Sequence, residues 1–504
     1  MLSRSFRVAF LYLIAEDDSM QFVLFSKFKI SIELLFLALV SSFIFYKFDE
    51  GNSFKLCSPT MLSCIKISVF ELFSFGYGDP CCCTLDHQPL YLVFLKFWSS
   101  IFGTSLFSVK FFSYIFYILS MFSIFLVGKK VFKQPLLYYV FPIIFILNGS
   151  FQDLSNYVYM YIHYFFFLTL AVYVLAQDHL NTEQKFFWSL LVLFVGALTF
   201  YITYMYWGLL LVIYVLWFRD ITSRRLYGLI LVSSIFFLAK TPVILLFRFV
   251  ERDTHSYVYS FYQSYVDIVT LLIGGKGHSK LDHIFKLFIC INSLIGFYLF
   301  QRKDHRKILV RYFLLTTIVS ICIYGVTSLL LRLDEIKVAY FVFWIFVFNF
   351  SIFYFYSKIL SRLLQMIFLG IHIYVLLVSA GHTLKRDKYN SFDQLVEKVQ
   401  QFIGPNTQEV FYLNGDAKYW LEGIYESKFQ KRLEFKNINL ISSFCPTSET
   451  VYFIDTHRDS LMGMDILMKM SEGCSVAYSI QQTDKISIDS FPHRWIIVRL
   501  KRDQ

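Results

Sequence analysis

The feature that most constrains this chain is a series of apolar runs, each close to the length of a membrane-spanning helix. A helix needs about 20 mainly apolar residues to cross the hydrocarbon core of a bilayer. Runs near that length occur at 30–46, 105–127, 135–149, 157–176, 186–202, 204–218, 226–247, 283–300, 312–331, 338–356 and 363–381. The sequence therefore predicts a polytopic α-helical membrane protein with about eleven transmembrane helices.

The composition excludes the other broad classes of protein. Only 16% of the 504 residues are charged and 57% are apolar, whereas a soluble protein carries roughly 25% charged residues. A soluble or disordered chain is therefore ruled out. The formal net charge is +11, but no nucleic-acid-binding motif accompanies it. We expect membrane lipids, and not nucleic acid, as partners.

The basic residues between the runs predict the topology. If the N-terminus is cytoplasmic, the clusters all fall in cytoplasmic connections, as the positive-inside rule requires. An odd number of runs then places the C-terminus on the extracytoplasmic face. The clusters are Lys129, Lys130 and Lys133; Arg219, Arg224 and Arg225; Arg302, Lys303, Arg306, Lys307 and Arg311; and Lys358 with Arg362.

Two domains are predicted. Residues 1–382 form the transmembrane domain, which includes a long first outward loop at 47–104, and residues 383–504 form a small extracytoplasmic α/β domain. In the second domain, helical and strand-like patterns alternate, which is typical of α/β folds. The expected strands are 410–413, 450–454, 476–480 and 495–500, and the expected helices are 391–402, 417–425 and 460–470.

The residues expected to take part in catalysis lie mainly in motifs in the first third of the chain. Asp49 and Glu50 follow the first apolar run, Asp86-His87-Gln88-Pro89-Leu90-Tyr91 lies in the outward loop, and Ile101-Phe102-Gly103-Thr104-Ser105 precedes the second run. In order and spacing, residues 30–176 resemble the GT-C membrane glycosyltransferases. The resemblance is to the branch of the protein O-mannosyltransferases and lipid A aminoarabinose transferase.

This sequence departs from the motif pattern of that branch at two positions. That branch has an Asp-Glu pair at the end of the first span and a His-Pro-Pro-Leu-Tyr-like motif, followed by a membrane-surface helix and a Phe-Gly-Ser-like turn. Gln88 stands where the motif has its first proline, which leaves that turn less restricted. Ser155 stands where a Glu-x-Arg-x-Tyr pattern has its arginine. The second departure puts one donor-phosphate contact in doubt.

The resemblance implies transfer of a sugar from a polyprenyl-phosphate carrier to a lipid, glycan or protein acceptor. The reaction would take place on the extracytoplasmic face of the cytoplasmic membrane, or at the endoplasmic reticulum in a eukaryotic host. An acceptor hydroxyl needs a base to take its proton, which is worth about 10²–10⁴ in rate. Asp49 is the expected base, and a single displacement would invert the anomeric centre.

The remaining site residues follow from the same implied reaction. Glu50 and Asp153 are further catalytic candidates. Asp49, Asp86 and Asp153 could hold a divalent ion, Mg²⁺ or Mn²⁺, through oxygen ligands, and metal dependence stays open. The candidates for the donor phosphate or substrate are His87, Lys240, Arg332, Lys337 and Tyr157.

Simpler structural roles compete with several of these assignments. Cations near a helix end are often snorkelling or surface residues, and Asp153 could be a helix cap. His163 is expected to be a hydrogen-bonded packing residue. Cys81, Cys82 and Cys83 do not have the spacing of a zinc site, so disulfides or inert thiols are favoured there.

A transporter or flippase is the alternative function for a polytopic chain. Transporters are typically built from inverted repeats whose paired helices are broken by glycine or proline near the midplane. The chain has 9 prolines and no visible pair of this kind. A glycan polymerase or ligase is a third possibility, but its long outward loop usually lies in the later half of the chain.

Overall fold

The computed structural model of the chain describes its middle almost continuously and its C-terminal part in pieces. All described residues belong to one compact unit, Ile44–Gln504. They are 89–103, 106–148, 151, 160–221, 223–250, 272, 280–304, 306–330, 342–359, 361–387, 399–403, 409–412, 434–437, 450–457, 478–487 and 494–502.

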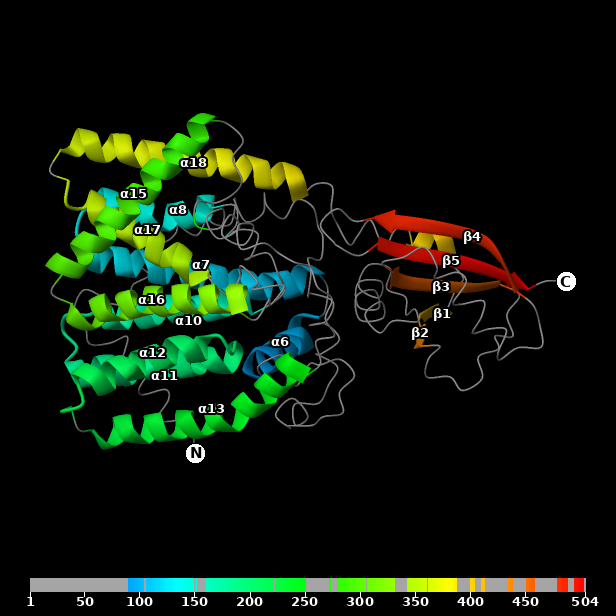
Figure 1. The fold of residues 1–504 in the computed structure, drawn as a ribbon, viewed down its shortest axis with the longest axis horizontal. Helices are drawn as coiled ribbons and strands as arrows, with labels where there is room; N and C mark the ends of the chain where they lie inside the picture. Colours follow the sequence, from blue (N-terminus) through cyan, green and yellow to red (C-terminus); the bar gives the residue numbers. More distant parts are fainter. Residues whose placement is uncertain are drawn as a thin grey trace. The chain divides into compact units, whose positions relative to one another are not determined.

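The middle of the chain is a bundle of helices in which most axes run in a similar direction and α15 runs obliquely to them (Figure 1). Each predicted apolar run from 105–127 onward overlaps one of these helices, so the helical class is confirmed. The first predicted run, 30–46, lies outside the described residues. The helices are α6 (Pro89–Phe102), α7 (Leu106–Phe132), α8 (Pro135–Leu147), α10 (Tyr161–Ala176), α11 (Thr182–Thr199), α12 (Thr203–Trp217), α13 (Arg224–Val250), α15 (Lys280–Lys303), α16 (Lys307–Leu330), α17 (Val342–Tyr356) and α18 (Arg362–Asp387).

Membrane-spanning length is a stricter test than helicity. Among the described residues, two helical stretches are long and apolar enough to cross a membrane, Ser108–Phe132 and Ile284–Arg302. Other apolar helices are shorter, such as α12 with 15 residues, which corresponds to about 22 Å. The number of about eleven spans therefore stays a prediction.

Small residues set the distances between neighbouring helices. A Cβ on Gly296 of α15 would collide with the backbone carbonyl of Ser351 in α17. One turn away, Ser293 donates a hydrogen bond to the carbonyl of Phe348 at 3.2 Å. Between α7 and α10, the hydroxyls of Ser123 and Thr169 lie 2.5 Å apart. In lipid, helices are held together by van der Waals packing, which small residues permit at close backbone distance, and by interhelical hydrogen bonds.

Aromatic rings fill the space between α7, α8, α15, α16 and α17. Phe141 of α8 lies at the centre of one cluster, with ring centroids 5.1 Å from Phe132 and from Phe353. Phe350 of α17 lies 5.1 Å from Phe300 and 4.9 Å from Phe313. Such pairs add about 0.5–1.5 kcal/mol each beyond the area they bury.

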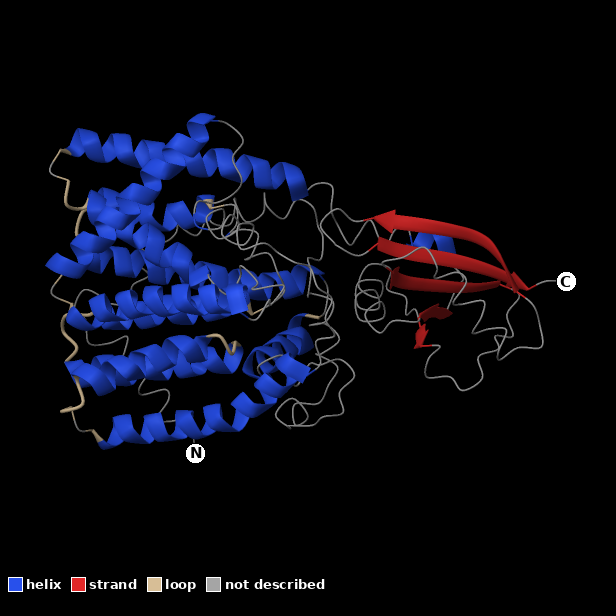
Figure 2. Ribbon diagram, viewed as in Figure 1, coloured by secondary structure: helices blue, strands red, loops and turns tan. Residues whose placement is uncertain are grey.

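The C-terminal part contains a five-stranded mixed sheet in the order β2-β1-β3-β5-β4. The strands are β1 (Glu409–Tyr412), β2 (Glu434–Asn437), β3 (Thr450–His457), β4 (Tyr478–Ser487) and β5 (Arg494–Arg502), drawn in red in Figure 2. β1 pairs in parallel with β2 and β3, and β5 pairs antiparallel with β3 and β4. The four predicted strands are present, and β2 was not predicted.

Alternate side chains along the strands are apolar and form one buried face of this sheet. Val451 and Phe453 of β3 are paired with Leu500 and Val498 of β5, and all four side chains are buried. Residues 399–403 are helical, as expected for the end of the predicted helix 391–402. The predicted helices 417–425 and 460–470 lie outside the described residues. The domain boundary near residue 382 stays a prediction.

Candidate functional site

Helix α6 carries the described part of the His-Gln-Pro-Leu-Tyr motif. Pro89 is its first residue, a position where the missing N–H costs nothing and the fixed φ suits the helix. Tyr91, Leu92 and Leu95 are fully buried along one side of this helix. Phe97 on another side is 67% exposed. The motif therefore leads into a helix that is anchored on one face.

Tyr91 is anchored by a histidine that follows it by more than 70 positions in the chain. The His163 ring of α10 meets the Tyr91 ring edge-on, at 4.8 Å between centroids and 76° between planes. Phe112 and Phe116 of α7 lie 4.9 Å and 4.1 Å from the same imidazole. Both Tyr91 and His163 are buried. His163 is thus a packing residue that joins α6, α7 and α10. The packing part of its predicted role is confirmed, and the hydrogen bond stays a prediction.

The Tyr91 phenol keeps its proton in this environment. Burial raises its pKa above the usual value, because an apolar site disfavours the phenolate. Among the described residues, the hydroxyl has no hydrogen-bond partner. Tyr91 therefore acts here through its ring contacts.

The far end of α6 is tied to the start of α7. The indole Nε1 of Trp98 donates to the carbonyl of Ser108 at 2.9 Å and lies 3.2 Å from its hydroxyl oxygen. Gly103 follows the helix with a φ of 78°, and its N–H donates to the Ser99 carbonyl at 2.9 Å. A left-handed glycine is a common helix end. It explains why the Phe-Gly-Ser-like turn has glycine at this position.

The opposite end of α7 gathers the basic connections. The described connections after α7, α10, α12, α15 and α17 meet there through side-chain contacts, and Figure 2 shows loops drawn in tan at this end. We call it the basic end. Gln134, after α7, donates to the Ser357 carbonyl at 3.4 Å and accepts from Gln365 of α18 at 3.1 Å. The Arg311 guanidinium of α16 lies over the Trp217 ring of α12, 4.9 Å from its centroid.

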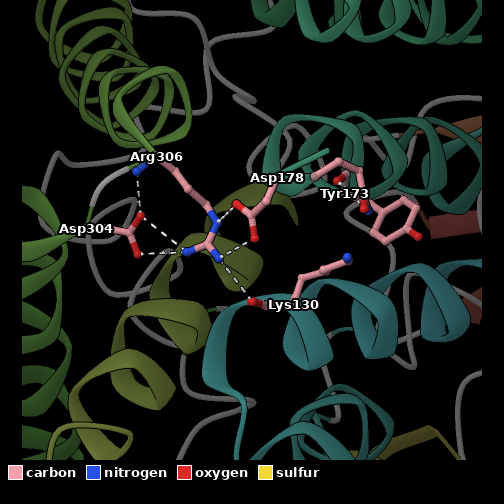
Figure 3. A network of polar contacts seen from close by, with 6 residues as sticks. Lys130, Tyr173, Asp178, Asp304 and Arg306 are labelled. Carbon is pink, nitrogen blue, oxygen red and sulfur yellow. Dashed lines mark hydrogen bonds and ion pairs between the residues drawn. The ribbon is translucent and has the colours of Figure 1, made fainter. Parts of the chain in front are cut away.

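Arg306 is the central cation of the basic end (Figure 3). Its Nε lies 3.4 Å from a carboxylate oxygen of Asp178, in the connection after α10. One terminal nitrogen lies 3.2 Å from Asp304, and the other donates to the Lys130 carbonyl at 3.1 Å. The side chains of Arg306 and Asp304 are each only 4% exposed. The sequence grouped Arg306 with the loop cations, but its side chain is buried and paired.

The motif helix and the basic end lie at opposite ends of α7. Ser108, which accepts from Trp98, is in the first turn of this helix, and Lys129 and Lys130 are in its last. The helix has 27 residues and is about 40 Å long. That separation exceeds the roughly 30 Å hydrocarbon core of a bilayer. The motif and the gathered cations therefore fit opposite sides of one membrane.

The predicted site residues fall almost entirely outside the described part of the chain. The backbone of Lys240 lies in α13. Among the described residues, no group of three or more His, Cys, Asp or Glu side chains could hold a metal ion. The predicted metal ligands lie outside that part of the chain. The roles of these residues stay predictions. Those outside are Asp49, Glu50, Asp86, His87, Asp153, Tyr157, Arg332 and Lys337.

Two contacts of the site region had no specific sequence signal. Asp178 is one carboxylate in a polar connection, and nothing local to it indicates a partner 128 positions away. The Tyr91–His163 contact also joins distant helices. The sequence predicted His163 as a packing residue, but it did not indicate Tyr91 as its partner. An ionisable residue inside an apolar run usually faces the interior of a bundle.

Comparisons with known proteins give a fold relationship. No family model matches the sequence, and no curated protein matches it. The structure matches ArnT from Cupriavidus metallidurans bound to undecaprenyl phosphate, with a TM-score of 0.56 and 9% identity. The match covers 92% of this chain and 97% of that one.

The chain has the fold of ArnT. The apo form of the same protein matches with a TM-score of 0.54 and 10% identity over the same shares of both chains. ArnT is a lipid A aminoarabinose transferase of the GT-C superfamily. It belongs to the branch that the motifs of residues 30–176 resemble. The resemblance is therefore confirmed at the level of the fold, while the low identity leaves the chemistry to be argued from residues.

Proposed function

We propose that the chain is a membrane glycosyltransferase that uses a sugar linked to polyprenyl phosphate. The observation that carries this proposal is the ArnT fold over 92% of the chain, together with the ordered motifs in its first third. ArnT has been solved with undecaprenyl phosphate bound, which supports a donor of the same chemical class here. The acceptor is a lipid, a glycan or a protein.

The reaction would take place at the motif end of α7. Because cations collect on the cytoplasmic side of membrane proteins, the basic end supports a cytoplasmic placement of that end. The start of α6 and the residues before it would then face the other side. A lipid-borne donor and a water-facing acceptor can meet at such a boundary.

Asp49 is proposed as the base and Glu50 and Asp153 as its neighbours in the site. Asp49 takes the acceptor proton while the acceptor oxygen or nitrogen attacks the anomeric carbon and the lipid phosphate leaves. One displacement of this kind inverts that carbon. His87, Tyr157, Lys240, Arg332 and Lys337 are proposed to bind the departing phosphate or the substrate. A Mg²⁺ or Mn²⁺ ion held by Asp49, Asp86 and Asp153 would also stabilise the growing negative charge.

The test compares envelope glycolipids, glycans and glycoproteins of the native host by mass spectrometry. The strains carry the wild-type chain, a deletion, Asp49→Asn, or Asp220→Asn as the matched control. Asp220 is an exposed carboxylate at the basic end, so its amide should leave the product unchanged. We expect deletion and Asp49→Asn to lose the same sugar-sized mass, when equal amounts of protein reach the membrane.

Two outcomes would contradict the proposal. If the Asp49→Asn strain makes the same product as the wild type, Asp49 is not the catalytic base. A deletion that accumulates the complete precursor on the cytoplasmic leaflet would favour the flippase alternative.

A further inference from the structure

The basic end carries a group of arginines outside the ion pairs of Arg306. Arg219, Arg224 and Arg225 lie in and just after the connection that follows α12, and Arg311 of α16 lies against the end of α12. We call these four residues the arginine corner. Among the described residues, none of them has a carboxylate within ion-pair distance, in contrast to Arg306. The connection itself holds one carboxylate, Asp220.

Aromatic rings hold Arg311 in place. Its guanidinium carbon lies 4.9 Å from the Trp217 ring centroid and 5.3 Å from that of Phe218. Trp217 is itself 46% exposed. Tryptophan and arginine side by side at a helix end are typical of the level of the lipid headgroups. The corner thus has a fixed cation at that level.

Helix stability does not explain the positions of Arg224 and Arg225. Both lie in the first turn of α13, which contains no acidic residue. The partial positive charge at a helix N-terminus disfavours cations there. Both side chains are exposed. A bound anion would offset the repulsion at this position.

The surface beside the corner is apolar. Val215 and Leu216 of α12 and Leu231 and Val232 of α13 are all exposed. A free phosphate ion would satisfy the arginines but would make no use of these side chains. A molecule with a phosphate head and hydrocarbon tails would contact both, since guanidinium groups match phosphate oxygens bidentately.

We propose that the arginine corner binds the headgroup of an anionic phospholipid in the leaflet at the basic end. The lipid phosphate lies among Arg219, Arg224, Arg225 and Arg311, and its acyl chains lie along the exposed sides of α12 and α13. This site is distinct from the proposed donor site, which is at the other end of α7. It does not depend on sugar transfer.

The test measures lipid adducts on the purified full-length chain by native mass spectrometry. Dioleoyl phosphatidylglycerol is titrated against dioleoyl phosphatidylcholine for the wild type and two triple variants. The first is Arg219→Gln/Arg224→Gln/Arg225→Gln. The matched control is Lys129→Gln/Lys133→Gln/Lys358→Gln, which removes the same charge from exposed positions of the same end.

We expect the wild type to bind phosphatidylglycerol more tightly than phosphatidylcholine. Each arginine near an anionic lipid surface contributes roughly fivefold, so the arginine triple should weaken binding by at least about tenfold. The lysine triple should stay within about threefold of the wild type. If the arginine triple does not fold, Arg219→Gln alone should still cost roughly fivefold, because Arg219 is exposed in a connection.

Three results would overturn the proposal. An equal loss of phosphatidylglycerol affinity in both triple variants would show a general electrostatic attraction to the basic end, and not a specific site. Equal affinity for the two lipids would remove the role of charge. Displacement of phosphatidylglycerol by millimolar inorganic phosphate would show a phosphate site that does not use the apolar surface.

Discussion

Arg306 and Asp178 lie 3.4 Å apart and join two helix connections that are 128 positions apart in the chain. Asp304 and the Lys130 carbonyl complete the surroundings of the guanidinium. The ends of α7, α10 and α15 are therefore fixed to one another by a single side chain. This relationship links three helix ends at the basic end of the bundle.

Arg306→Gln is expected to lower the free energy of unfolding by about 3–5 kcal/mol, because it leaves the buried Asp304 carboxylate without its cation. Asp178→Asn should cost only about 1 kcal/mol, since the Asp178 side chain is 53% exposed and water replaces part of the interaction. Thermal unfolding in detergent measures both. Lys307→Gln, an exposed neighbour, is the control, and an equal loss there would contradict this account.

Gly296→Ala is expected to destabilise the contact between α15 and α17, because the new Cβ would meet the Ser351 carbonyl. Overpacking of this kind typically costs about 1–3 kcal/mol. Gly370→Ala in α18 is the matched control, since a Cβ there meets nothing within 4 Å. That variant should be neutral or more stable by up to about 1 kcal/mol, because alanine is the better helix former. Equal melting temperatures for the two variants would refute the predicted close approach.

Tyr91→Phe is expected to keep both stability and product formation. The Tyr91 hydroxyl is buried and has no hydrogen-bond partner among the described residues, so its removal relieves a desolvation cost. Tyr91→Ala should lower stability by about 3–5 kcal/mol through the cavity that it leaves, and should reduce product by loosening the start of α6. Unfolding curves and the glycan profile test both variants. Loss of product in a stable Tyr91→Phe protein would instead place the hydroxyl in the chemistry.

The fragment 383–504 is expected to fold on its own as a soluble α/β domain. Its sheet has an internal core, in which the Phe411 and Phe453 rings lie 5.7 Å apart and Val498 is fully buried. Circular dichroism and amide-proton NMR of the purified fragment would show mixed secondary structure and dispersed signals. An unfolded or aggregated fragment would contradict the predicted domain boundary.

Local patterns predicted most of the elements. Apolar runs located the helices from α7 to α18, with boundaries that shifted by a few residues, such as 157–176 against Tyr161–Ala176. The strand β2 was missed because Glu434-Phe435-Lys436-Asn437 has one apolar residue and is held by its register with β1. A strand of this kind has no signal of its own, since its partner supplies the stabilising contacts.

The sequence by itself determined the helical membrane class, the order of the elements and the motifs that resemble GT-C enzymes. These features are encoded locally, in the length and period of apolar residues and in short motifs. The tertiary structure alone decided how individual cations are used. Arg306 is buried between Asp178 and Asp304, whereas Arg219, Arg224 and Arg225 remain exposed. Burial and pairing depend on which distant segments pack together, and that arrangement is set by contacts between helices that no local pattern records.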